Sequence, residues 1–254
     1  MVLDYAQIIK TASGRQPPGA VRACRQGDVC LFVVTDGYGS AQAAELAADT
    51  AVQTFLYAPA FHAGTIIRLF NTAHHALVQH NDAIRYEQRE DAENPPQEPA
   101  KTIHMRDMDL RAQGGLQKGD AGYVQTQLWG GDGPLSAAIS IWLSDGQTAI
   151  WGSVGDICTY VISGKTITAC EGNDAELGMC ELMSFEINQS ELSDWDIYLL
   201  TTREFRHVPK EEAYKLCRRE DFAQEISKNL LAHGESILMD YQGVIILCRC
   251  EGAG

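Results

Sequence analysis

The chain has 254 residues and 45% of them are hydrophobic, so it is long enough to bury one large core or two small ones. Its formal net charge of −14 argues against nucleic acid or an anionic membrane as the main partner. No stretch reaches the roughly 18 apolar residues of a membrane span, and the N-terminus lacks the basic and apolar regions of a signal peptide. We therefore expect a cytoplasmic protein.

Eight cysteines are present, none of them in a Cys-x-x-Cys pair, and most lie inside apolar runs. This pattern favours reduced thiols in the core over zinc ligands or disulfides. Three histidines, His74, His75 and His80, fall on a predicted helix, where they are adjacent or widely spaced. We expect them at the surface rather than in a metal site.

The hydrophobic pattern predicts an α+β fold, with two antiparallel sheets and pairs of helices on the outside. Two strands at 20–24 and 29–34 form a hairpin, and two helices follow at 41–57 and 65–86. After them the sequence predicts a four-stranded antiparallel meander at 137–143, 149–153, 158–162 and 166–170. Two further strands at 183–187 and 196–200 follow, then a helix that begins at 209, a helix at 222–232 and a last strand at 244–248.

Residues 87–133 interrupt this pattern. Glu87 to Pro99 is acidic and contains three prolines, and several glycines follow. We expect a single domain over residues 1–254 with an insertion at about 87–133, part of which is mobile and dispensable for folding.

A buried strand and a long helix are predicted on either side of Asp36-Gly37-Tyr38-Gly39. Glycines let the backbone turn sharply after Asp36 and approach a ligand closely. The Asp36 carboxylate could hold a metal ion there, with the Gly37 carbonyl beside it. Asp-Gly is also an ordinary turn dipeptide, so these residues alone leave both interpretations open.

With this motif, the chain resembles the metal-dependent protein phosphatases of type 2C. The family has an Asp-Gly-x-Gly turn between a strand and a helix, as at Asp36. It has Val-Gly-Asp at the end of a meander strand, matched by Val154-Gly155-Asp156, and an aspartate shortly before the last strand, matched by Asp240. The resemblance covers nearly the whole chain except about 87–133, and it implies the two-sheet phosphatase fold.

The resemblance also implies a chemistry. In this family two magnesium or manganese ions, held by oxygens, activate water for attack on phosphoserine or phosphothreonine. Carried over to this sequence, the metal ligands are Asp36, Gly37 and Asp240, with Asp156 as an outer ligand. Arg15 is the candidate for contact with the phosphate.

The sequence departs from the family where other acids are expected. Pro17 to Ala20 stand where an acidic element follows the arginine in the family, and the segment from Cys170 to Met183 is short for the family's flap. Arg203 stands where a metal-binding aspartate should follow the strand at 196–200. A one-residue shift would let Glu204 supply that carboxylate. Otherwise the Arg203 guanidinium is a cation substitute between Asp36 and Asp240.

Three hypotheses follow from the resemblance and these departures. The first is a pseudophosphatase, with no metal or weakly bound magnesium or manganese, that binds a phosphoprotein or a Ser/Thr kinase. The alternative is an active Mg/Mn-dependent Ser/Thr phosphatase that hydrolyses phosphomonoesters. A third is a relative of the sporulation and stress-response phosphatases that act on small regulator proteins.

Overall fold

The computed structural model describes residues 2–10, 19–38, 41–93, 134–173, 175–179, 186–202, 205, 208, 210–217, 222–234 and 241–249. The chain divides into two units, residues 1–78 with 135–254 and residues 79–134. Part of the expected insertion, up to Glu93, continues helix α2 (Ala63–Glu93), which is longer than predicted. The rest of the insertion lies outside the described residues.

The described part of the first unit contains two five-stranded sheets in which every pairing is antiparallel. In sheet order, the first consists of β1 (Val2–Lys10), β10 (Tyr241–Arg249), β9 (Ile197–Thr202), β6 (Ile157–Ser163) and β7 (Thr166–Glu171). The second consists of β2 (Gly19–Gln26), β3 (Val29–Gly37), β4 (Ala137–Ser144), β5 (Thr148–Val154) and β8 (Ile187–Glu191).

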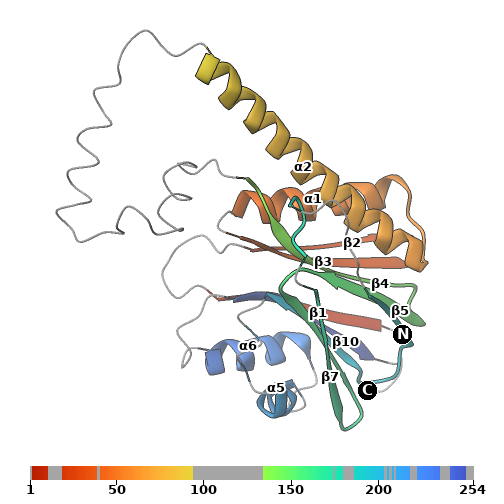
Figure 1. The fold of residues 1–254 in the computed structure, drawn as a ribbon. Coiled ribbons are helices and arrows are strands. Elements are labelled where there is room, and N and C mark those ends of the chain that lie inside the picture. Colours follow the sequence, from red (N-terminus) through yellow and green to blue (C-terminus); the bar gives the residue numbers. More distant parts are fainter. Residues whose placement is uncertain are drawn as a thin grey trace, which may run out of the picture. The chain divides into compact units, whose positions relative to one another are not determined.

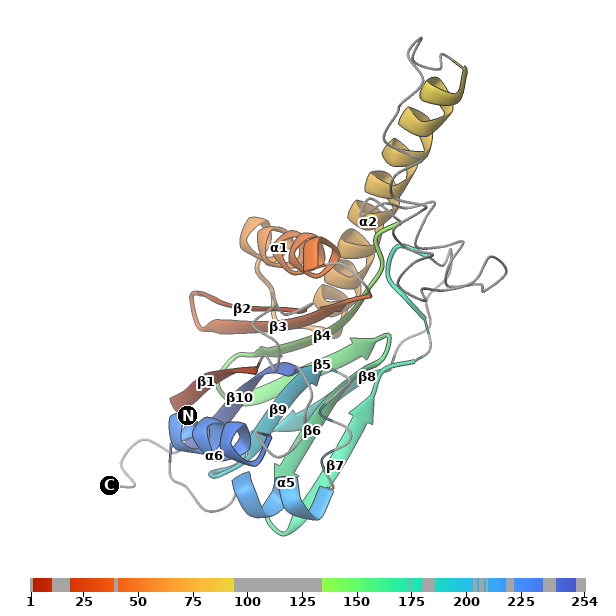
Figure 2. The same cartoon turned by 90° about the vertical axis from the view of Figure 1, so that its left-hand side faces the viewer.

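Helices cover the outer faces of both sheets, which confirms the predicted α+β fold (Figures 1 and 2). Helix α1 (Ala41–Tyr57) and the first part of α2 pack on the β2–β3–β4–β5 side. Helices α5 (Lys210–Cys217) and α6 (Ala223–Gly234) pack on the β1–β10–β9–β6 side. No helix in the described ranges is long and apolar enough to cross a membrane.

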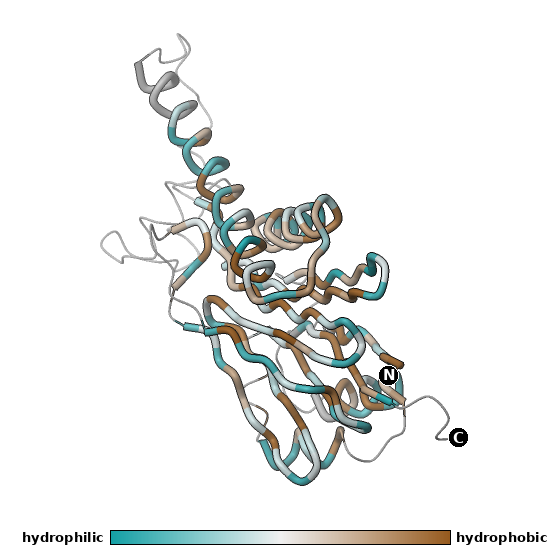
Figure 3. The backbone as a smooth tube through the Cα atoms, turned by 90° about the vertical axis from the view of Figure 1, so that its right-hand side faces the viewer, coloured by the Kyte–Doolittle hydropathy of each residue, from teal (hydrophilic) through white to brown (hydrophobic). Residues whose placement is uncertain are grey.

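A third apolar layer joins the inner faces of the sheets and contains Phe32, Trp142, Tyr198 and Val244. Figure 3 shows hydrophobic segments along the strands of both sheets and hydrophilic ones at several turns. Small side chains let α1 approach its sheet, because Ala44, Ala47 and Ala48 are all fully buried. The Thr35 hydroxyl also donates to the Ala44 carbonyl oxygen at 2.8 Å, so α1 is fixed to β3 next to Asp36.

The predicted meander is wrong in one respect, because its four strands are divided between the two sheets. β4 pairs with β5, whereas β6 pairs with β7 and β9. The chain crosses from one sheet to the other at Gly155-Asp156. Gly155 has a φ of 84°, and a Cβ there would lie 2.7 Å from the Ala138 Cβ and 2.8 Å from its Cα. Glycine is therefore required at the crossing.

Most of the strand expected at 183–187 lies outside the described residues, and β8 runs from Ile187 to Glu191. It is an edge strand whose residues are half-buried or exposed. Its polar sequence therefore carries little of the apolar pattern on which the prediction was based.

The crossing at Gly155 yields a stability prediction. Gly155→Ala should lose about 1–2 kcal/mol to left-handed backbone strain and a further ~1–3 kcal/mol to crowding against Ala138. Gly146→Ala is the matched control, because Gly146 has a φ of 86° but nothing within 4 Å of its Cβ position. Urea unfolding, monitored by tryptophan fluorescence, gives the free energy of unfolding of both variants. Equal losses for the two would contradict the packing described at Gly155.

Candidate functional site

Asp36 lies near the end of β3 with a side chain that is only 4% exposed. Strand pairing on both sides of β3 positions Asp36, which lies opposite Gly19 of β2 and Ala138 of β4. Gly37 is the last residue of β3 and pairs with Ala137. The sequence therefore places a buried carboxylate at one end of the second sheet, as the Asp-Gly motif predicts.

The first sheet reaches the same place through Thr202 and Gln242. The Gln242 backbone N–H donates to the Thr202 hydroxyl oxygen at 3.1 Å, which joins the end of β9 to the start of β10. A Cβ on Gly19 would lie 2.5 Å from the Thr35 carbonyl oxygen and 3.2 Å from the Thr202 Cγ2. The absence of a side chain at Gly19 thus lets the two sheets meet beside Asp36.

Four of the predicted site residues, Arg15, Arg203, Glu204 and Asp240, lie outside the described residues. Their positions in the sequence are nonetheless informative: Arg203 directly follows Thr202 of β9, and Asp240 directly precedes Tyr241 of β10. β9 therefore ends, and β10 begins, at the meeting point of the two sheets.

Asp156 comes to the same end of the fold from the turn between β5 and β6. Its backbone N–H donates to the Tyr38 hydroxyl oxygen at 2.9 Å, while the Tyr38 N–H donates to the Ser136 carbonyl oxygen at 3.0 Å. Tyr38 is the variable residue of the Asp-Gly-x-Gly motif, and the sequence analysis assigned it no role. Through its side chain it fixes the Asp156 turn relative to Asp36.

Residues 172–173 and 175–179 belong to a third segment of the site. Leu177 and Ala137 exchange two backbone hydrogen bonds, so this segment takes the place beside β4 that β5 leaves at Gly155. The Asn173 side-chain oxygen accepts from the N–H groups of Gly155 and Ala175 at 3.3 and 3.2 Å. The short flap expected from the sequence thus begins as a strand-like extension of the second sheet.

His74 corrects the expectation that the helical histidines lie at the surface. It is 7% exposed, and its Nδ1 accepts the Gly178 N–H at 3.1 Å. Burial, with a smaller contribution from the neighbouring His75, lowers the pKa of His74. A neutral imidazole therefore fastens this segment to α2, whereas His75 is exposed as expected.

Several carboxylates surround the Tyr38 side chain. Burial raises the pKa of Tyr38 to about 12, and the negative charges of Glu176, Asp156 and Asp36 contribute to this rise. These three carboxylates come from three different segments of the chain. Tyr38 therefore remains a neutral phenol and can hydrogen-bond at the centre of an acidic region.

The described donor groups do not form a metal centre on their own. Within the part of the chain that the structure describes, no three His, Cys, Asp or Glu side chains are grouped so that they could hold an ion. The two-ion site implied by the resemblance would need oxygens beyond Asp36, Gly37 and Asp156. Asp240 and Glu204 lie outside the described residues, so the described part of the chain supplies only part of that ligand set.

No family model and no curated protein sequence matches this chain. Solved structures share its fold. The serine/threonine phosphatase Stp1 from Staphylococcus aureus has a TM-score of 0.70 and 14% identity, over 99% of this chain and 96% of that one. The catalytic domain of the serine/threonine phosphatase PstP, in complex with two manganese ions, has a TM-score of 0.63 and 12% identity, over 97% of each chain.

A third solved structure comes from work on the bacterial stressosome, a modular system that has been adapted to control secondary messenger signalling. It has a TM-score of 0.61 and 15% identity to this chain. The match covers 97% of this chain and all of that one. The chain therefore has the fold of the metal-dependent serine/threonine phosphatases, as the sequence motifs predict. At this level of identity the likeness concerns the fold alone.

The Tyr38 hydroxyl yields a prediction. Tyr38→Phe removes the acceptor of the Asp156 N–H and should lower the free energy of unfolding by about 1–3 kcal/mol. Tyr57→Phe is the matched control, because Tyr57 is 92% exposed and its change should stay within about 0.5 kcal/mol. Urea unfolding at pH 7.5 compares the two. A loss at Tyr38 no larger than at Tyr57 would show that the hydrogen bond does not hold the turn.

His74 yields a prediction about pH. An unfolded histidine takes up a proton near pH 6.5, whereas burial lowers the pKa of His74 in the folded chain. Stability due to neutral His74 is therefore complete above about pH 6.5 and is lost as the pH falls below that value. His74→Asn keeps an acceptor without a titrating group, so its free energy of unfolding should decline less than that of the wild type between pH 7.5 and 5.5.

The control for this experiment is His75→Asn, which replaces the exposed neighbour and should leave the pH dependence close to that of the wild type. Urea unfolding at several pH values gives both slopes. An unchanged slope in His74→Asn, or an equal change in His75→Asn, would contradict the role given to His74.

Proposed function

We propose that this chain is a pseudophosphatase, a cytoplasmic regulatory module with the phosphatase 2C fold that acts by binding a phosphoprotein or a Ser/Thr kinase. The observation that carries the proposal is the residue after β9: the strand ends at Thr202, and an arginine follows where the family has a metal-binding aspartate. The similarity to a stressosome protein supports a signalling role without indicating a partner.

Electrostatics supports a cation substitute at this point. Asp36 is 4% exposed, and a buried carboxylate must be paired with a cation, a metal ion or hydrogen-bond donors. In the proposal, the Arg203 guanidinium supplies the charge and several donors to Asp36 and Asp240. A guanidinium keeps such a pair of acids in place but cannot generate a metal-bound hydroxide, so hydrolysis would be lost.

The proposed partners also follow from charge. A net charge of −14 disfavours nucleic acid and anionic membranes. A phosphorylated segment would need a local cation, and Arg15, to which the resemblance assigns the phosphate contact, is the candidate. A kinase or phosphoprotein could be bound through this region without turnover.

The alternative is an active Mg/Mn-dependent Ser/Thr phosphatase, favoured by the retention of Asp36, Gly37 and Asp156 at one end of the sheets. In that case Asp240 and Glu204 would complete the ligand set. The two manganese ions in the PstP structure indicate which metal to test.

The cation-substitute proposal predicts that two variants lose stability and that one of them is partly rescued by manganese. Arg203→Ala should lower the free energy of unfolding by about 3–5 kcal/mol, because buried carboxylates lose their counter-charge. Arg203→Asp should lower it further without metal and recover part of the loss in millimolar manganese. Arg85→Ala is the control, since its partner Asp82 is 3.5 Å away and both side chains are exposed, so it should cost less than about 1 kcal/mol.

Urea unfolding with and without manganese measures these changes. The wild type should be insensitive to the metal and should not hydrolyse a generic phosphate ester. A small loss in Arg203→Ala, together with metal-dependent hydrolysis by the wild type, would support the active-enzyme alternative instead.

A further inference from the structure

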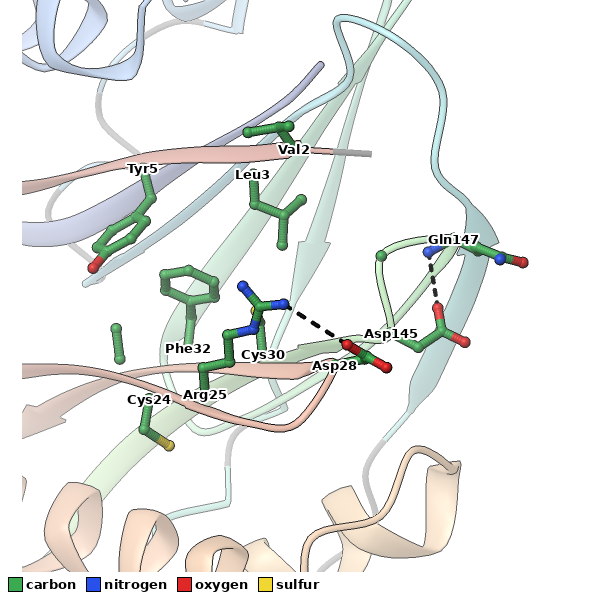
Figure 4. A pocket seen from close by; sticks show the side chains of 12 residues that line it. Val2, Leu3, Tyr5, Cys24, Arg25, Asp28, Cys30, Phe32, Asp145 and Gln147 are labelled. Atoms are coloured by element: carbon green, nitrogen blue, oxygen red, sulfur yellow. Dashed lines mark hydrogen bonds and ion pairs between the residues drawn. The ribbon is translucent and has the colours of Figure 1, made fainter. Parts of the chain in front are cut away.

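A cavity of about 660 Å³ lies at the end of the sheets opposite Asp36. Strand β1 forms one wall, the β2–β3 hairpin forms the other, and the turn between β4 and β5 closes one side (Figure 4). Cys30 lines the cavity, and Asp36 lies further along the same strand, about 20 Å away at roughly 3.3 Å per residue. The cavity is therefore separate from the candidate site described above.

An aromatic and aliphatic surface forms the interior of this cavity. Leu3 and Tyr5 extend from β1 toward Phe32 on β3 (Figure 4). The rings of Tyr5 and Phe32 meet edge to face with centroids 5.0 Å apart, yet Tyr5 remains 53% exposed. A planar apolar group entering here would cover aromatic surface that now faces solvent.

A guanidinium with weak partners lies between the two walls. The Arg25 Nε donates to the Gly27 carbonyl oxygen at 2.9 Å, and an Nη of Arg25 lies 3.9 Å from the Asp28 carboxylate. The two side chains are 68% and 96% exposed, so this ion pair contributes little and can be exchanged at small cost. The terminal N–H groups of Arg25 are thus available to donate two parallel hydrogen bonds to a carboxylate.

Arg22, on the same strand, has closer hydrogen-bonding partners than Arg25. Its Nε lies 2.7 Å from the Asp49 carboxylate, and its Nη1 donates to the Val21 carbonyl oxygen at 3.2 Å. Asp49 belongs to α1, so Arg22 faces the outer side of the sheet, away from the cavity. Of these two arginines, Arg25 is the one that a ligand can reach inside the cavity.

Two carboxylates, Asp28 and Asp145, also line the cavity, so a bound anion must replace Asp28 beside the Arg25 guanidinium. One oxygen of the Asp145 carboxylate accepts hydrogen bonds from the N–H groups of Gln147 and Thr148, so this side chain is held within the turn between β4 and β5. Burial raises the pKa of Cys24 to about 11 and also raises the pKa of Cys30. Both thiols are therefore uncharged at neutral pH.

We propose that this cavity binds a small aromatic carboxylate, with its ring against Tyr5, Phe32 and Leu3 and its carboxylate on Arg25. The volume falls within the range of about 300–1,000 Å³ that is usual for small-molecule sites. Charge-assisted hydrogen bonds to the guanidinium select the anion, and the apolar walls select the ring. This binding does not depend on whether the chain is a phosphatase.

Calorimetric titration of the full chain with 2-naphthoate, and with its uncharged analogue 2-naphthamide, tests the proposal. We expect 2-naphthoate to bind with a Kd below about 1 mM and 2-naphthamide to bind at least several-fold more weakly. Arg25→Gln should weaken 2-naphthoate by about tenfold or more, the value of one charge-assisted hydrogen bond, and leave 2-naphthamide unchanged.

Arg22→Gln is the matched control and should bind 2-naphthoate as the wild type does. Tyr5→Ala should weaken both compounds, because it removes part of the apolar wall. Circular dichroism checks that each variant is folded. We expect Arg25→Gln to fold as the wild type does, because Arg25 is exposed. No binding to the wild type, equal affinity for the two compounds, or an equal loss in Arg22→Gln would each overturn the proposal.

Discussion

The burial of the Asp36 carboxylate is the constraint on which this fold depends at its functional end. A carboxylate with 4% exposure in the middle strands of a sheet requires compensation by positive charge or hydrogen bonds. Around it, the fold brings together the ends of β3 and β9, the start of β10 and the Asp156 turn. A serine/threonine phosphatase with this fold binds two manganese ions, and in this chain Arg203 directly follows Thr202, the last residue of β9, in the sequence. Retaining the arrangement while replacing an acid with arginine is what the pseudophosphatase proposal explains.

Most of the fold could be predicted because its central strands are continuous apolar runs. Val29 to Val34 becomes β3, and residues 137–143 become most of β4, with every residue of β4 buried. Two of the edge strands, β1 and β8, were harder to predict. β1 alternates exposed and buried residues, and β8 is largely polar, so neither gives a strong apolar pattern. The division of the meander between two sheets depends on the conformation of Gly155, and a glycine in the sequence does not reveal its φ.

The site could be predicted only as far as its motifs reach. Asp36, Gly37 and Asp156 lie at one end of the fold, because Asp36 and Gly37 are the last two residues of β3 and Asp156 directly precedes β6. Tyr38 and His74 were missed for a common reason: their roles are hydrogen bonds to the backbone N–H groups of Asp156 and Gly178, which lie about a hundred residues away along the chain. A tyrosine in the motif and a histidine pair on a helix carry no sequence signal for such partners.

The measurement that tests the central claim most directly is a calorimetric titration of the wild-type chain with manganese at pH 7.5. If Arg203 takes the structural place of a metal ion beside Asp36, titration to millimolar manganese should give no saturable heat. The related fold with two manganese ions sets the opposite expectation. Saturable binding of two ions per chain, abolished in Asp36→Asn, would contradict the account and identify a metal-dependent phosphatase site.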